Sequence, residues 1–373
     1  MSHSLRSAAV LFSSVLGAAL LAHCSSDPDP VVTDAGSDAA SDVVADTPVD
    51  VTVDAPLDAG PCATDASDEL PLLLSCAGLY ADIAKKTVAP GLVSYQPGIQ
   101  FWSDGAVKER WLYLPPNQTI DVSDLDDWKF PVGTKAWKEF KVNGKRIETR
   151  VFWKRGPTDW TWATYVWAAD ESEATKNDDG AKNVVGTYEI PDKNTCDQCH
   201  NGRKDKLLGL EAIALAIPTA QGITLDSLAK AGRLAPTPSK TTATLPEDST
   251  GKAGAALGHL HMNCGVTCHN HYGGAGAALS GLYMKLPAAL VLAGTATVTS
   301  LETYTTSANQ TIGAANFVTF KNAGYTRLTP GMSGKSLIPA LIGMRGAFQM
   351  PPIVTHEPDT AGELLVKGWI DAL

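Results

Sequence analysis

Two short segments of this 373-residue chain combine a pair of cysteines with a histidine that follows at once. The first reads Cys196-Asp-Gln-Cys199-His200, which is the C-x-x-C-H pattern of a c-type haem attachment site. The chemistry sets this spacing, because two thiols add to the vinyl groups on one edge of a porphyrin and the adjoining imidazole binds the iron. A disulfide within the pair and half of a zinc site are the alternatives.

The second segment has one residue more between its cysteines and reads Cys264-Gly-Val-Thr-Cys268-His269. Both sulfurs can still reach a porphyrin edge if the extra residue bulges, and Gly265 permits such a bulge. We therefore predict a second haem site here, with a Cys264–Cys268 disulfide as the alternative.

A methionine held by two prolines, Met350-Pro351-Pro352, lies farther along the chain. Proline fixes φ and lacks a donor, so the segment is stiff and aims the thioether. Ligation by Met and His raises the potential of a haem, which suits an electron carrier. We predict Met350 as the distal ligand of the second haem; a core role for it, or ligation by Met332 or Met344, are the alternatives.

Two predicted helices flank these ligands. Residues 250–263, rich in small side chains, predict a helix capped by Ser249, and residues 359–373 predict a final helix with one apolar face. Thr360 and Glu363 read as a capping box. A helix before the haem motif that packs on a terminal helix after the methionine is the cytochrome c arrangement.

No distal ligand is evident for His200. The candidates are His259, His261, His271 and Met284. Such histidines are more often surface or packing residues, and an open distal position would instead favour an enzyme such as a dihaem peroxidase or oxidase.

The start of the chain indicates export. An apolar run before Cys24 has the length of a signal-peptide core, and Leu21-Ala-His-Cys24 is similar to a lipobox. We predict that 1–24 is a lipoprotein signal whose Cys24 carries lipid and anchors the chain to a membrane; an ordinary cleaved signal and an uncleaved anchor are the alternatives. The predicted location is the outer membrane, the cell surface or the periplasm. In an oxidising compartment Cys62 and Cys76 make a plausible disulfide.

Residues 25–60 predict a disordered tether. Aspartates recur every fourth residue between Ala, Val, Thr and Pro, and 1–60 holds nine Asp and one Arg. This segment carries most of the net charge of −10, so the rest of the chain is close to neutral. A body without a basic face gives no reason to expect nucleic-acid binding.

Short aromatic runs separated by turn residues predict an antiparallel sheet in the region 61–194, with a hairpin turn at Asn143-Gly144. The expected fold is α+β and multidomain: an antiparallel β-sandwich-like domain, followed over 195–373 by an all-α cytochrome c-like region. The tryptophan cluster of the sheet reads as core.

Several runs carry a family resemblance that covers roughly residues 95–373. They are Phe101-Trp-Ser-Asp-Gly-Ala, Trp128-Lys-Phe-Pro-Val-Gly-Thr, Glu148-Thr-Arg, both cysteine motifs, Met350-Pro-Pro and the final Gly368-Trp-Ile. Together they resemble a bacterial family of exported dihaem c-type cytochrome-like proteins, in which a β-rich region precedes a cytochrome c region. The resemblance implies haem at both motifs, although the family pattern lacks the extra residue of the second. Asp104 and Lys108 in the first run are either catalytic or turn and capping residues.

The sequence thus predicts a membrane-anchored protein that passes electrons to redox partner proteins through one or two haem c groups. A dihaem peroxidase or oxidase, and a haem-free binding lipoprotein stapled by disulfides, are the rival hypotheses.

Overall fold

The computed structural model describes Cys62 and residues 70–313 and 315–373, all within one compact unit that spans Pro56–Leu373. The predicted signal peptide 1–24, its lipidation site Cys24 and the tether 25–60 lie outside the described residues. No helix in the described part of the chain is both long and apolar enough to span a membrane.

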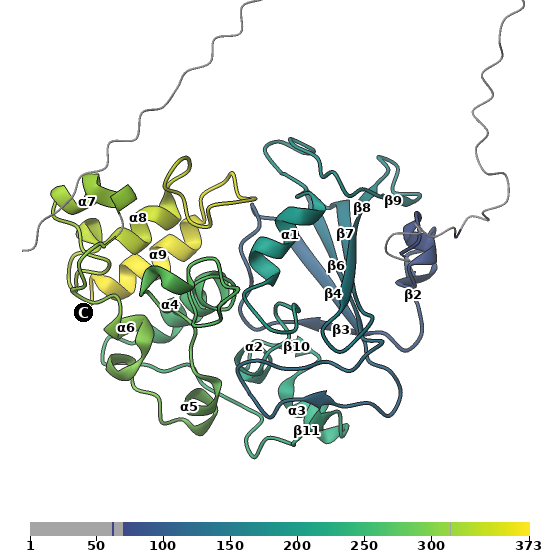
Figure 1. The fold of residues 1–373 in the computed structure, drawn as a ribbon, viewed down its shortest axis with the longest axis horizontal. Coiled ribbons are helices and arrows are strands. Elements are labelled where there is room, and N and C mark those ends of the chain that lie inside the picture. The colour runs from purple at the N-terminus through teal and green to yellow at the C-terminus, as the bar shows by residue number, and fades with distance from the viewer. Residues whose placement is uncertain (1–61, 63–69, 314) are drawn as a thin grey trace, which may run out of the picture. The chain divides into compact units, whose positions relative to one another are not determined.

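A single antiparallel sheet of seven strands dominates the first half of this unit (Figure 1). In spatial order its strands are β10 (Gln221–Gly222), β3 (Val93–Gln96), β4 (Val107–Tyr113), β6 (Lys135–Val142), β7 (Lys145–Lys154), β8 (Trp160–Trp167) and β9 (Ala174–Lys176). Two small ladders pair β1 (Tyr80–Asp82) with β2 (Thr87–Val88), and β5 (Ile120–Asp121) with β11 (Leu234–Ala235).

The hairpin between β6 and β7 turns at Asn143-Gly144, as predicted. Both residues adopt positive φ, 51° and 80°, which is the conformation that this pair favours in two-residue hairpins.

The helices in the described residues are short. They are α1 (Lys193–His200), α2 (Ala212–Ala216), α3 (Leu225–Lys230), α4 (Ala253–Leu260), α5 (Ala288–Ala293), α6 (Glu302–Thr305), α7 (Val318–Asn322), α8 (Leu337–Gly343) and α9 (Thr360–Ile370). A π-helical turn, η2 (His261–Gly265), continues α4. Single 3-10 turns are η1 (Leu74–Cys76), η3 (Ala278–Ser280), η4 (Val298–Ser300), η5 (Ala315–Phe317) and η6 (Ser333–Lys335).

The expected fold class is wrong. One seven-stranded sheet stands where a two-sheet sandwich was expected, and only short helices follow it rather than an all-α cytochrome domain. The physical reason is that the further sheets in the described residues are the two-stranded ladders β1–β2 and β5–β11, which are too small to form the second layer of a sandwich. One face of the sheet packs against the segment around η1 through Trp111, Trp137 and Tyr165. The other face packs against the helices in a larger core that includes Phe152 of β7 and Trp369 of α9.

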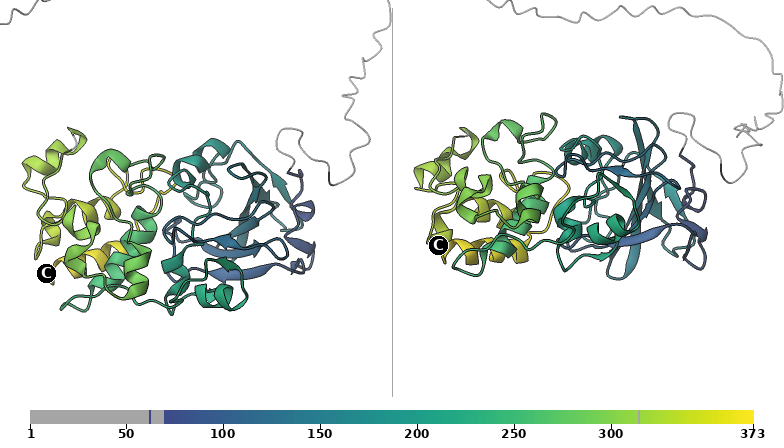
Figure 2. Two further views of the ribbon diagram at one scale, coloured as in Figure 1. Left: turned by 60° about the horizontal axis from the view of Figure 1, so that its bottom comes forward. Right: turned by 90° about the horizontal axis from the view of Figure 1, so that it is seen from below.

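The two helices expected to flank the haem ligands form and meet. Helix α4 packs against α9, and α8 packs against α9 as well (Figure 2). The helices begin differently from expectation: the Glu247 carboxylate accepts from the Ala253 and Gly254 amides, and Asp359 rather than Thr360 caps α9. At the crossing, a Cβ on Gly362 would lie 2.2 Å from Cε1 of His259, so only glycine allows this approach.

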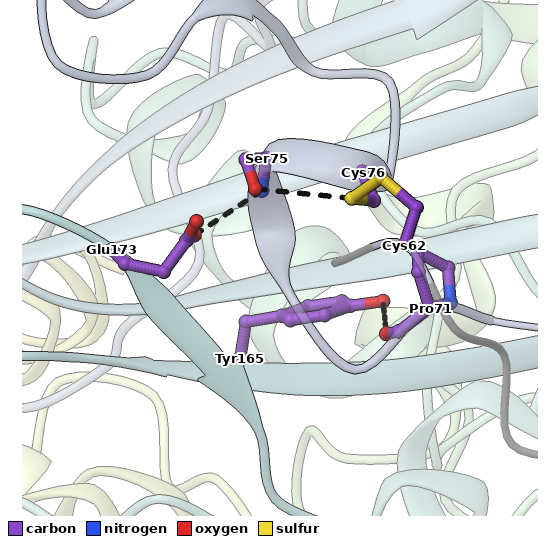
Figure 3. The surroundings of a disulfide bond; sticks show 6 residues. All are labelled: Cys62, Pro71, Ser75, Cys76, Tyr165 and Glu173. Atoms are coloured by element: carbon purple, nitrogen blue, oxygen red, sulfur yellow. Dashed lines mark hydrogen bonds between the residues drawn. A yellow bond between two sulfur atoms is a disulfide. The ribbon is translucent and has the colours of Figure 1, made fainter. Parts of the chain in front are cut away.

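A disulfide joins Cys62 to Cys76, whose Cα atoms lie 5.3 Å apart (Figure 3). The backbone next to it is tied to the sheet, because the Ser75 amide donates to Glu173 at 3.2 Å and the Tyr165 hydroxyl donates to the Pro71 carbonyl at 2.8 Å. These two hydrogen bonds hold the segment around Cys76 against the sheet.

Candidate functional site

The second cysteine motif follows directly from α4 through the π turn η2. This π turn ends at Gly265, and a second turn of the same width, closed five residues after Cys264, accommodates the extra residue of the motif. The amides of Cys268 and His269 both donate to the Cys264 carbonyl, at 3.1 and 2.8 Å. Gly265 is required here, since a Cβ would lie 2.5 Å from the Lys285 backbone nitrogen.

The imidazole of His269 is oriented by its Nδ1 atom, which lies 3.1 Å from the Leu282 carbonyl oxygen. A carbonyl only accepts, so Nδ1 carries the proton and Nε2 is left with a lone pair, as a metal-binding histidine requires. Burial lowers the pKa of His269, which keeps the ring neutral at neutral pH.

An apolar cavity of about 420 Å³ opens beside this motif. Its lining includes Cys264 and His269 from the motif, Leu282 and Met284 after it, Ile338, Leu341 and Ile342 from α8, Arg327, and Met350. Cavities of this size and character hold organic cofactors.

Met350 reaches the cavity from a segment far from the motif in sequence. Its amide donates to the Leu341 carbonyl at 2.9 Å, and the neighbouring Gln349 side chain donates to the Thr355 carbonyl at 2.8 Å. Met284 lines the same cavity, but its amide donates to the His269 carbonyl at 2.8 Å, so it belongs to the histidine's own segment. The competing sulfurs of Met332 and Met344 are not among the lining residues.

The first motif forms helix α1, capped by Asp192. The His200 ring repeats the orientation of His269, because its Nδ1 lies 2.6 Å from the Lys206 carbonyl oxygen. Burial, with a contribution from Lys138, lowers the pKa of His200 to about 3, so this ring is also neutral. The Phe152 ring stacks on it at a centroid distance of 4.4 Å.

The space beside His200 is much smaller than that beside His269. The cavity there measures about 30 Å³ and is lined by Tyr95, Lys138, Arg150, Phe152 and His200, among others. This is room for about two water molecules and not for a porphyrin. The first motif therefore has the right donor atoms but no cavity large enough for a porphyrin. At the second motif Cys264 and His269 line the large cavity, and Cys268 is not among the lining residues.

The two motifs pack against each other. A Cβ on Gly202 would lie 1.8 Å from the Thr267 carbonyl oxygen, so the backbones touch. The buried Asn270 amide bridges them by donating to the Gly265 carbonyl at 2.7 Å and the Gly202 carbonyl at 3.3 Å. Groups held at the two motifs would thus be neighbours.

None of the predicted distal candidates lines the described cavity beside His200. His259 lies 3.7 Å from the Asp359 carboxylate, His261 accepts from the Leu286 amide at 2.9 Å, and the exposed His271 lies 2.9 Å from Glu302. These contacts assign the three histidines to packing and surface roles.

Asp104 also takes a structural role. It adopts φ 48° and accepts from the His356 and Glu357 amides, at 2.9 and 3.2 Å, so it shapes a turn beside the Met350 segment. Lys108 is 7 % exposed and donates to the Phe101 carbonyl.

Within residues 62, 70–313 and 315–373, no three His, Cys, Asp or Glu side chains converge as a metal-binding group. Free thiols in this part of the chain are Cys196, Cys199, Cys264 and Cys268.

Comparison of the chain with protein families, with characterised proteins and with solved structures finds no match.

Two features of the site were not predicted from the sequence. The first is the pair of carbonyls, from Lys206 and Leu282, that orient the histidines, because backbone acceptors leave no mark in side-chain identity. The second is the pair Arg110 and Lys138, which lie on the face of the sheet toward the first motif and could have been noticed as charges in strands that otherwise read as core.

Proposed function

We propose that this protein is a c-type cytochrome-like electron-transfer protein, with a haem attached through Cys264 and Cys268. His269 and Met350 would hold its iron. The observation that carries the proposal is that one apolar cavity of about 420 Å³ is lined by Cys264, His269 and Met350, which come from two distant segments. A haem would supply reversible one-electron chemistry there.

The chain's own residues explain how such a group would be used. The Leu282 carbonyl holds the His269 proton on Nδ1 and frees Nε2. Ile338, Leu341 and Ile342 exclude water, which together with a thioether ligand favours a raised reduction potential. Leu279, wholly exposed on the rim of the cavity, leaves an apolar edge open toward a redox partner protein.

We further propose that the protein is exported and held to a membrane by lipid on Cys24. The lipobox-like run Leu21-Ala-His-Cys24 supports the lipid anchor, and the Cys62–Cys76 disulfide suits an oxidising compartment. The electron-transfer partners would then be other proteins of the periplasm or the outer surface.

The test of the proposal is the full chain produced together with c-type haem maturation. The oxidised protein should show the weak red absorption band of sulfur ligation to ferric haem, and Met350→Ala should abolish it and lower the reduction potential. Met332→Ala is the matched control, because Met332 is 53 % exposed and lies outside the cavity lining. A band that survives Met350→Ala would contradict the assignment of this ligand.

A further inference from the structure

The large cavity beside the second cysteine motif has one cation in an otherwise apolar wall. Among the described residues that line it, Arg327 is the only lysine, arginine, aspartate or glutamate. The backbone of Arg327 is held on both sides, because its amide donates to the Gln310 carbonyl at 2.9 Å and its carbonyl accepts from the Ile338 amide at 3.2 Å. The chain therefore fixes the position from which this side chain meets the cavity.

Backbone carbonyls, and no carboxylate, hold the guanidinium of Arg327. Its Nη1 donates to the Gly281 carbonyl and, at 2.9 Å, to the Thr306 carbonyl, and its Nη2 donates to the Ser280 carbonyl at 2.8 Å. These bonds use three of the five N–H groups of a guanidinium. Nε–H and one N–H of Nη2 have no acceptor among the described residues, and no carboxylate of this part of the chain pairs with Arg327.

The electrostatics around Arg327 agree with an uncompensated charge. Burial alone lowers its pKa, and no described acidic group opposes this shift. The pKa of His269 is lowered by burial and also by the charge of Arg327, which therefore acts on the histidine of the second motif. An arginine stays ionised inside a protein, and an ion beside apolar walls is costly unless an opposite charge meets it.

The unused donors define the chemistry of that opposite charge. Nε and Nη2 share one edge of the guanidinium, and two N–H groups on one edge match the two oxygens of a carboxylate. The rest of the lining is largely aliphatic, with Leu282, Ile338 and Leu341 among its residues. We infer that Arg327 binds the carboxylate of an amphipathic acid whose apolar body fills this cavity.

Two molecules carry this chemistry. One is a haem attached at the second motif, which would offer a propionate to Arg327; the other is a free fatty acid. The first rests on the proposed function, and the second does not. The shared lining favours the first, because Cys264 and His269 border the same cavity as Arg327.

The experiment begins with the full chain produced together with haem maturation, and intact mass shows whether it carries haem. In the loaded protein, resonance Raman spectroscopy follows the bending band of the haem propionates, which responds to hydrogen bonds on their oxygens. Arg327→Gln should shift this band to lower frequency, because the carboxylate loses its charged donor. Arg327→Lys should give a smaller shift, and it decides the question if the glutamine variant does not load haem. An unchanged band overturns the inference and leaves the proposed function standing.

Arg345→Gln is the matched control. Arg345 also donates to three backbone carbonyls, those of Ile342, Met344 and Glu357, but it is not among the residues that line the cavity. Loss of such carbonyl contacts changes stability in both variants. The Raman shift should appear only with Arg327→Gln, since a purely structural arginine would leave the propionate band where it is.

A chain without haem contradicts the proposed function, and the inference is then tested on that chain by calorimetric titration. The probes are sodium laurate and methyl laurate, which differ in the carboxylate alone. Wild type should bind laurate about tenfold more tightly than the ester, as expected for a charge-assisted hydrogen bond. Arg327→Gln should abolish this preference, and Arg345→Gln should keep it. Equal affinities of wild type for the two probes, or no binding of either, overturn the inference.

Discussion

The crossing of α4 and α9 yields the sharpest prediction about stability, through two glycines of one helix. In Gly362→Ala the new Cβ would lie 2.2 Å from Cε1 of His259 and 2.7 Å from Oδ2 of Asp359. His259 is 8 % exposed, so its ring has little room to yield. In Gly368→Ala nothing lies within 4 Å of the new Cβ.

The expected magnitudes have opposite signs. Alanine is favoured over glycine in a helix by about 1 kcal/mol, and this is the whole effect expected at Gly368. Overpacking a closed site costs about 1–3 kcal/mol, and the short approach at Gly362 places it at the upper end, so a net loss of about 2 kcal/mol remains. At about 2–4 °C per kcal/mol, the midpoint should fall by about 4–8 °C for Gly362→Ala and rise by about 2–4 °C for Gly368→Ala.

Differential scanning calorimetry of the two variants beside wild type measures this directly. Because α4 leads into the second cysteine motif, Gly362→Ala should also reduce the fraction of chains that acquire haem there. A Gly362→Ala protein as stable as Gly368→Ala would refute the close crossing, and with it the placement of α9 against α4.

Two further predictions concern buried polar groups. Burial raises the pKa of Glu211, but His261, Arg203 and the Ala214 amide outweigh burial and lower this pKa to about 2. The ionised carboxylate therefore stabilises the fold above its ordinary pKa of 4.5, and this stability is lost as the pH falls toward 2. Glu211→Gln should therefore cost on the order of 2–3 kcal/mol at pH 7 and flatten the acid limb of a stability–pH curve; an unchanged acid limb would contradict this. Asn270→Ala leaves the Gly265 and Gly202 carbonyls without their shared donor, so it should lower the free energy of unfolding by about 1–3 kcal/mol in urea titrations. An unchanged free energy of unfolding would argue against the bridge between the motifs.

The parts of the fold that depend on neighbouring residues could be predicted from the sequence. The Asn143-Gly144 hairpin is an example, because two adjacent residues select the turn. The helix before the second motif, predicted from its small residues, and the final helix, predicted from its apolar periodicity, both form, although their caps were misplaced. Ser249 and Thr360 have the usual capping types, but Glu247 and Asp359 do the capping, since loop geometry decides which oxygen reaches the free amides.

The parts that depend on pairing between distant strands could not be predicted. Alternation in a strand shows that one face is buried, but it does not show whether a second sheet or helices bury it, and this is why the sandwich was wrong. The alignment of Arg110, Lys138 and Arg150 across β4, β6 and β7 depends on the register of three strands, which no local pattern contains.

For the candidate site, the residues could be predicted from the sequence, but the structure reverses which of the two motifs is the better candidate for a haem. The first motif has the standard spacing, but the cavity beside its His200 is small. The second motif has an added residue, but its Cys264 and His269 line the large cavity. The spacing of the cysteines indicates only whether two sulfurs can reach one edge of a porphyrin. The volume beside them depends on α8 and the Met350 segment, which lie far along the chain.

The most direct measurement is mass spectrometry of peptides from the full chain after expression with the haem maturation machinery. The peptide that contains Cys264 and Cys268 should carry a covalently bound haem, with a c-type pyridine haemochrome spectrum for the intact protein. A colourless protein whose Cys264 and Cys268 are free thiols, or are joined to each other, would contradict the account.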